Sequence, residues 1–380
     1  MKKKGLALIL ISALTMGTLV GCGGGSGSTG SSGDTPKEND SPKIGATIYS
    51  FEDNFMSYQR RNIEKLCNGK AELLMNDSQN NQSKQIEQVD TMIAKGVDIL
   101  AINLVDPKSA PTVVDKAKAD NLPVVFFNKE PDEAVMQSYD KVWYVGTTSE
   151  ESGIIQGEVM AEGWKANPAW DKNGDGKIQY VMLKGEPGHP DAEARTKYSI
   201  ETINKAGIET EELAMDTAMW DSTKATEKMD AWIAKNGDNI EMVICNNDGM
   251  ALGAISSLEK AGYLDGTPEK FVPIYGVDAI PEALDKIKAG KMAGTVLNDA
   301  KNQAQALVDS CMNLVNGKEI TEGTNWKLDD KKSIRVPYVG ITKDNINVAE
   351  DSYKEFIKNK GAISKLILIY ALNKTGGKKR

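Results

Sequence analysis

From residue 44 onward, short apolar runs alternate with longer segments whose apolar residues recur at the spacing of a helix. One such segment carries Ile86, Val89, Ile93 and Ala94, which fall on one helical face. The apolar runs are nearly continuous rather than alternating, which is typical of strands buried on both faces of a parallel sheet. The pattern therefore predicts an α/β fold in which helices cover both faces of parallel sheets.

The predicted strands fall into two sets that are separated by a helix near residues 153–167. The first set comprises residues 44–49, 72–76, 99–103, 124–128 and 142–146, and the second comprises residues 179–183, 211–214, 242–246, 274–277 and 294–296. A chain of 380 residues exceeds the size of one compact core. The two sets therefore predict two α/β lobes.

Polar and aromatic residues gather directly after these strands, where open α/β sheets bind their ligands. They are Asp53, Phe55, Asn128, His189, Asp191, Arg195, Asn247, Asp278 and Asn298, and Trp220 stands in a loop between strands. Carboxylates, amides and a guanidinium can hydrogen-bond hydroxyl groups, and aromatic faces can cover the C–H patches of a sugar ring. The set indicates a site for an uncharged, polyhydroxylated ligand. An alternative for each single position is that Asp and Asn are common helix caps and turn residues.

A second motif has the spacing of a calcium loop. Asp171, Asn173 and Asp175 occupy its first, third and fifth positions, and the Lys177 carbonyl and Gln179 occupy the seventh and ninth.

The twelfth position of that loop, where a bidentate Glu is expected, is Met182. The missing carboxylate must come from elsewhere, and Glu241 is the candidate. We expect a structural Ca²⁺ rather than a calcium sensor. The alternative is a solvated Asp/Asn/Gly turn.

The N-terminus reads as a bacterial export signal. Three lysines precede an apolar segment that is too short to span a membrane, and residues 19–22 resemble a lipobox that ends in Cys22. The prediction is a signal peptide over residues 1–21, lipid attachment at Cys22, and a flexible Gly/Ser-rich tether over residues 22–42. Plain secretion is the alternative.

Charge and cysteine count exclude two further classes. The net charge of −8 makes nucleic acid an unfavourable partner. Without Cys22, the chain keeps Cys67, Cys245 and Cys311, and an odd number cannot pair completely. The chain is therefore not a disulfide scaffold.

Several longer segments resemble the galactose/glucose-binding receptors of sugar ABC transporters, which have the type I periplasmic-binding-protein fold. The matching segments are residues 48–57, 73–80, 101–107, 125–131, 185–195, 216–221 and 294–299. The resemblance covers roughly residues 44–356. It implies two Rossmann-like lobes joined by a three-strand hinge, and an extracytoplasmic, lipid-anchored monomer that closes on its sugar.

The resemblance also implies roles for single residues. Phe55 and Trp220 would sandwich the pyranose ring of D-galactose or D-glucose, and the polar residues gathered after the strands would bind its hydroxyls and ring oxygen. The calcium site would map onto Asp171, Asn173, Asp175, Lys177, Gln179 and Glu241. The implied partners are an ABC transporter permease and a chemoreceptor.

The resemblance sets domain boundaries as well. One lobe would combine residues 43–146 with 299–335, and the other, with the calcium loop, residues 147–298 with 336–357. Residues 358–380 have no counterpart in the family and no assigned role.

Other functions remain as alternatives. The same fold would serve a sensor subunit that presents sugar to a membrane receptor or kinase. A sugar enzyme could use Asp53 in a carboxylate pair, but no nucleophile or metal ligand stands near His189 in the sequence. A sugar-responsive repressor is disfavoured by the export signal. We therefore expect a binding protein and no enzymatic activity.

Overall fold

The computed structural model describes residues 41–354 and 356, which belong to one compact unit that begins at Ser41. The signal peptide, Cys22 and nearly all of the predicted tether lie outside the described residues, as does the tail over residues 358–380. Among the described residues, no helix is both long enough and apolar enough to cross a bilayer.

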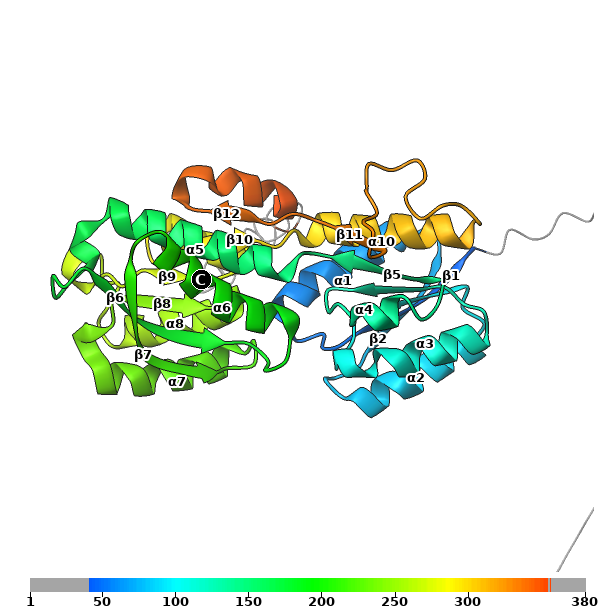
Figure 1. Cartoon of the computed structure of the whole chain (residues 1–380), viewed down its shortest axis with the longest axis horizontal. Helices are drawn as coiled ribbons and strands as arrows, with labels where there is room; N and C mark the ends of the chain where they lie inside the picture. Colours follow the sequence, from blue (N-terminus) through cyan, green and yellow to red (C-terminus); the bar gives the residue numbers. More distant parts are fainter. Residues whose placement is uncertain (1–40, 355, 357–380) are drawn as a thin grey trace, which may run out of the picture. The chain divides into compact units, whose positions relative to one another are not determined.

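The first lobe is built on a six-stranded parallel sheet (Figure 1). In spatial order its strands are β11 (Ser333–Arg335), β5 (Val142–Gly146), β4 (Val124–Phe127), β3 (Ile99–Ile102), β1 (Lys43–Ile48) and β2 (Glu72–Asp77). Every pairing in this sheet is parallel, so the carboxyl ends of the strands meet at one edge.

The second lobe is built on a four-stranded parallel sheet. Its strands in order are β7 (Glu209–Thr217), β6 (Lys177–Lys184), β8 (Met242–Cys245) and β9 (Ile274–Tyr275). Single bridges connect this edge to β10 (Thr295–Leu297), which pairs antiparallel with β12 (Val339–Ile341). The parallel expectation therefore holds for the main sheet and fails at this last strand pair.

Pairs of helices cover the sheets. In the first lobe, α1 (Asn54–Cys67) packs on α10 (Ala300–Val315) and α2 (Gln82–Ala94) packs on α3 (Ala110–Ala119), with the short α4 (Glu133–Met136) beside α3. In the second, α5 (Ser149–Ala166) packs on α6 (Pro190–Lys205) and α7 (Ser222–Asn236) on α8 (Asp248–Lys260), which contacts α9 (Pro281–Lys288). Buried aliphatic clusters lie beneath both sets of pairs.

The chain passes between the two lobes at three places. It leaves the first sheet after β5 to enter α5, returns from β10 to α10, and leaves again after β11 to enter β12. Figure 1 shows these crossings, with α10 and β11 beside the first lobe and β10 and β12 beside the second. Three connections therefore join the two lobes.

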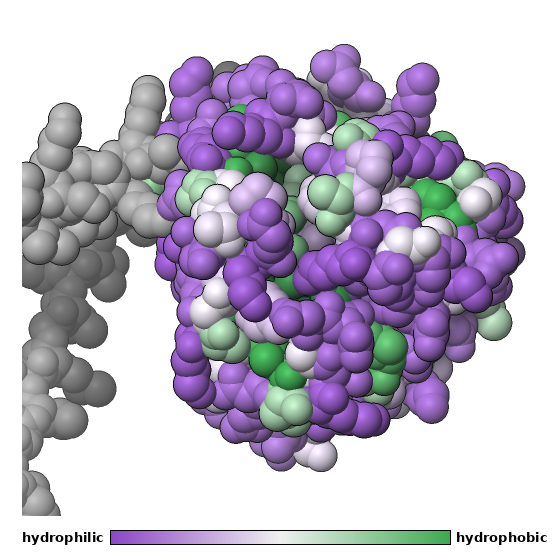
Figure 2. Space-filling view, turned by 90° about the vertical axis from the view of Figure 1, so that its left-hand side faces the viewer, coloured by the Kyte–Doolittle hydropathy of each residue, from purple (hydrophilic) through white to green (hydrophobic). Residues whose placement is uncertain are grey.

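The sequence pattern missed β11 and β12 because neither strand contains two consecutive apolar residues. It also predicted a shorter β7 than the structure shows, since the ends of that strand are polar. On the face of the molecule that Figure 2 shows, the surface is mostly hydrophilic, with apolar residues scattered in small patches. This face offers no broad apolar patch of the kind that marks a protein interface.

Candidate functional site

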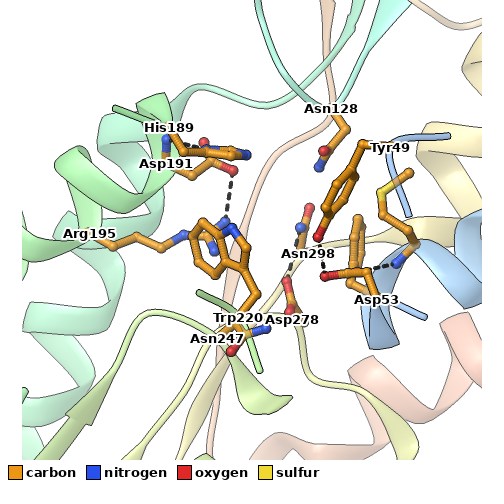
Figure 3. A pocket seen from close by; sticks show the side chains of 12 residues that line it. Tyr49, Asp53, Asn128, His189, Asp191, Arg195, Trp220, Asn247, Asp278 and Asn298 are labelled. Carbon is orange, nitrogen blue, oxygen red and sulfur yellow. Dashed lines mark hydrogen bonds and ion pairs between the residues drawn. The ribbon is translucent and has the colours of Figure 1, made fainter. Parts of the chain in front are cut away.

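All ten residues predicted to contact a ligand line one pocket. Figure 3 shows residues of the first lobe on one side, residues of the second lobe on the other, and Asp278 and Asn298 between them. The cavity that these residues enclose is narrow, with a volume of about 30 Å³, well below the usual range of small-molecule sites. Tyr49 and Met56 also line the pocket, and sequence reasoning gave them no role.

The first lobe contributes a carboxylate that already has several partners. Asp53 caps α1, where its Oδ1 accepts a hydrogen bond from the Met56 amide at 2.7 Å. Its Oδ2 accepts from the Tyr49 hydroxyl at 2.6 Å (Figure 3). Phe55 follows in the first turn of α1 and is 4% exposed. The cap thus fixes the direction of both the carboxylate and the ring.

Asn128 follows β4 with a left-handed φ of 63°, a conformation that Asn tolerates better than most residues. The Asn103 amide donates to its Oδ1 at 3.0 Å, and the Tyr144 hydroxyl donates to its carbonyl at 2.9 Å. With Oδ1 held in this way, the amide nitrogen of Asn128 is the group it can offer to a ligand hydroxyl.

The second lobe contributes an ion pair at the start of α6. His189 caps this helix, because its Nδ1 accepts from the Asp191 amide at 3.1 Å. Asp191 accepts from the Ser149 hydroxyl at 2.6 Å and from Arg195 Nη2 at 3.0 Å. Since Nδ1 is an acceptor, the neutral imidazole carries its proton on Nε2.

Arg195 is almost fully buried and tied to several elements. Its Nε donates to the Ser152 hydroxyl at 3.0 Å, its Nη1 to the Asn246 carbonyl at 2.8 Å, and its Nη2 also to the Tyr338 hydroxyl at 3.0 Å. Tyr338 in turn contacts the Thr147 hydroxyl at 2.8 Å. These two residues belong to two of the three connections between the lobes, so Arg195 is anchored at the hinge.

Trp220 lies against the backbone of Gly185. A Cβ at position 185 would lie only 2.2 Å from the indole, so glycine is needed there for the ring to reach this place. The backbone of Met219 and Trp220 is left-handed, with φ of 54° and 64°. The indole also meets the His189 ring edge-on, with centroids 5.1 Å apart. A close approach and an unusual turn therefore aim this ring into the pocket.

A chain of amides and carboxylates lies where the two lobes join. Asn298 donates to Asp278 at 3.1 Å and accepts from Gln303, which lies on α10. Asn247 caps α8 through its Oδ1, which accepts from the Met250 amide at 2.9 Å. Gln303 is a positioning residue that the sequence did not reveal, because it lies inside a helix rather than after a strand.

Burial shifts the pKa of the pocket carboxylates and of the imidazole. Desolvation raises the pKa of Asp53. It raises the pKa of Asp278 well above the usual range, although the charge of Arg195 opposes this shift. Burial together with the charges of Lys129 and Arg195 lowers the pKa of His189 to about 3. His189 is therefore a neutral hydrogen-bonding group near pH 7.

The loop with calcium-loop spacing lies in the second lobe, apart from the pocket. Gly174 and Gly176 have φ of 74° and 77°, so the loop makes the turns that its spacing predicts. Asp171 accepts from the amides of both glycines, at 2.7 and 3.0 Å. Glu241 reaches the loop from outside, since its Oε1 accepts from the Lys172 amide at 2.7 Å.

The donor set of this loop fits a hard cation such as Ca²⁺, which prefers oxygen ligands. The Oε1 of Gln179 is buried and has no hydrogen-bond partner among the described residues. Lys177 directs its ammonium to Glu209 at 3.1 Å, so only its carbonyl would serve as a ligand. In the described part of the chain, no three carboxylate, imidazole or thiol side chains gather closely enough to hold a metal, so amide and carbonyl oxygens would have to complete the set.

Comparison with known proteins gives consistent results. A family model described as a periplasmic binding protein domain matches residues 44–319. The D-galactose/methyl-galactoside binding periplasmic protein of Haemophilus influenzae is 56% identical over 307 residues, which cover 80% of this chain and 90% of that protein. A putative rhizopine-binding protein of Rhizobium meliloti is 30% identical over 308 residues, 80% of this chain and 91% of that protein.

A solved structure is also similar. An ABC transporter solute-binding protein from Bacillus halodurans, with bound myo-inositol, aligns with a TM-score of 0.68 at 28% identity. The alignment covers 83% of this chain and 100% of that one. The two-lobe fold is therefore shared over nearly the whole described part of the chain.

Proposed function

This chain belongs to the periplasmic binding protein family, and from that premise we propose that it is the extracytoplasmic receptor that delivers D-galactose or D-glucose to an ABC transporter. It is a binding protein and not an enzyme. The sugar enters between the lobes and, because it contacts both, stabilises the closed state.

One observation carries the choice of ligand. The pocket is lined by carboxylates, amides, a guanidinium and a neutral imidazole, next to Phe55 and Trp220. Such a lining can hydrogen-bond the hydroxyl groups around a sugar ring, and the two aromatic side chains can cover the apolar faces of that ring. The 56% identity to a galactose-binding relative supports the same choice.

The test is a calorimetric titration of the chain from residue 23 onward with D-galactose and D-glucose separately, using ribose and myo-inositol as comparison ligands. We expect one-to-one binding of at least one hexose that is much tighter than binding of either comparison ligand. Folded protein that shows no heat with either hexose would contradict the proposal.

Two structural features complete the proposal. Ca²⁺ would stabilise the loop through Asp171, Asn173, Asp175, Lys177, Gln179 and Glu241 without contacting the sugar. Lipidation at Cys22 would hold the receptor at the outer face of the cell membrane. Mass spectrometry of the membrane fraction tests the anchor, because a Cys22→Ala variant should lose the lipid mass and leave the membrane.

The receptor has two downstream partners in this proposal. The permease of the transporter would take the sugar from the closed receptor, and a chemoreceptor would read the same closed state. Co-purification of crosslinked membrane partners, with and without sugar, separates the two, since each would be captured preferentially with the sugar-bound form.

A further inference from the structure

Lys129 is a buried cation next to the pocket but outside its lining. It follows Asn128 in the first lobe, and its side chain is 1% exposed. Its Nζ donates to the Val105 carbonyl at 2.9 Å within the same lobe. It also lies 4.2 Å from the centre of the Tyr49 ring, so one face of the ammonium rests on an aromatic group that attracts cations.

The remaining partner of Lys129 comes from the opposite lobe. Glu186 lies between β6 and α6, and its Oε2 accepts from Lys129 Nζ at 2.8 Å. The Glu186 side chain is 23% exposed, so the pair lies at the margin of the interface between the lobes. Neither residue lines the pocket.

The pair is arranged so that opening the lobes must break it. The Val105 and Tyr49 contacts lie within the first lobe and would remain, whereas the contact with Glu186 would be lost. Lys129 is too buried to be freely hydrated, and a desolvated charge depends strongly on its counter-charge. Tyr49 also donates to Asp53, which connects Lys129 to a pocket carboxylate through a single ring.

We propose that Lys129 and Glu186 form a latch between the lobes that sets how long the receptor stays closed and therefore how slowly the sugar dissociates. They act as positioning residues, since neither lines the pocket. The inference rests on the proposed function for its sugar-dependent part only, because the latch would also bias closure without sugar.

The experiment compares Glu186→Gln with Glu259→Gln in the full chain. Glu259 is a matched control, because it has a similar exposed fraction (30%) and pairs with Lys286 and Lys291 inside the second lobe. Stopped-flow fluorescence with D-galactose and D-glucose gives association and dissociation rates. Double electron–electron resonance between non-cysteine spin labels at the exposed positions Asp115 and Lys235, one on each lobe, gives the closed fraction without sugar.

For Glu186→Gln we expect the dissociation rate to rise about fivefold, with the association rate changed less than twofold, as for loss of an ion pair at the margin of the lobe interface. Glu259→Gln should leave both rates unchanged. Glu186→Asp, which keeps the charge, should fall between wild type and Glu186→Gln. Equal dissociation rates for Glu186→Gln and Glu259→Gln would overturn the latch.

The spin-label distances separate failure of the latch from failure of the proposed function. If the wild type binds neither hexose, the proposed function fails, and the spin-label distances alone then test the latch. A smaller closed fraction in Glu186→Gln than in Glu259→Gln would then support the latch. Identical distance distributions would overturn it.

Discussion

The ligand pocket and the calcium loop use the same residue types in opposite surroundings. The pocket collects Asp and Asn from distant parts of both lobes, and most of them are buried. The loop takes its Asp and Asn from one short exposed stretch and only Glu241 from elsewhere. The loop residues thus come mostly from one segment, whereas the pocket needs residues from both lobes.

The pKa shifts express this difference. Burial raises the pKa of Asp53 and Asp278 in the pocket. In the loop, the backbone hydrogen bond from Lys177, with the Gln179 and Asn173 amides, lowers the pKa of Asp175. A ligand that donates hydrogen bonds would therefore stabilise the ionised form of a pocket carboxylate. A loop carboxylate is ionised without such a ligand, which would favour binding of a cation.

The largest effect should come from breaking the anchor of the pocket. Arg195→Met removes the partner of Asp191 and four hydrogen bonds. We expect the free energy of unfolding to fall by about 3–5 kcal/mol, because removing one member of a buried ion pair leaves a charge without compensation. Urea denaturation measures this, and a loss below about 1 kcal/mol would contradict the anchoring role.

The next effect should fall on ligand affinity alone. Trp220→Ala should weaken hexose binding by about 2–4 kcal/mol, as expected for loss of a buried aromatic anchor. Trp326→Ala provides the control, since that half-buried indole donates to Asp309 away from the pocket. Calorimetric titration of both variants decides the matter, and unchanged affinity in Trp220→Ala would rule out stacking on this ring.

Removing calcium should affect stability and spare the pocket. At a Ca²⁺ concentration about 100-fold above its Kd, binding stabilises the native state by about 2.7 kcal/mol, or roughly 5 °C in Tm for a protein of this size. Chelation should therefore lower Tm by about that amount and change hexose affinity less than twofold. Asp171→Asn should reproduce the Tm shift without chelator, and insensitivity of Tm to Ca²⁺ would contradict the site.

A further effect should fall on the pH dependence of stability. Because the pKa of His189 falls from 6.5 to about 3 on folding, the unfolded chain binds the extra proton between these values. The contribution of neutral His189 to the free energy of unfolding is complete above pH 6.5. It is lost as the pH falls, by about 1.4 kcal/mol per pH unit. His189→Asn should flatten the stability profile between pH 4 and 6 by that slope, and parallel profiles would contradict a buried neutral imidazole.

Roles were easiest to predict from the sequence for residues that directly follow parallel strands, and the reason is physical. Asp53 and Asn247 were open to two interpretations, helix cap or ligand contact, whereas His189 was predicted as a ligand contact. The structure shows that each caps its helix with one atom while also lining the pocket. Since caps lie at the carboxyl edge of the sheet, one residue can do both.

Other parts of the site left no sequence signal. Gln303 contacts a residue that lines the pocket, and Lys129 contacts Glu186 of the opposite lobe. These two contacts depend on the packing of α10 and on the approach of the second lobe. The strands β11 and β12 contain no run of consecutive apolar residues. The two-lobe α/β fold was predicted correctly because apolar strand segments alternate with amphipathic helices along the chain, whereas contacts between lobes arise only from the tertiary arrangement.

The most direct test of the account is a crystal structure of the chain from residue 23 onward with D-galactose or D-glucose. The account predicts a pyranose ring between Phe55 and Trp220, with hydroxyls within hydrogen-bond distance of Asp53 in one lobe and Asp191 and Arg195 in the other. A sugar bound to one lobe alone, or a ring that does not lie against Trp220, would contradict it.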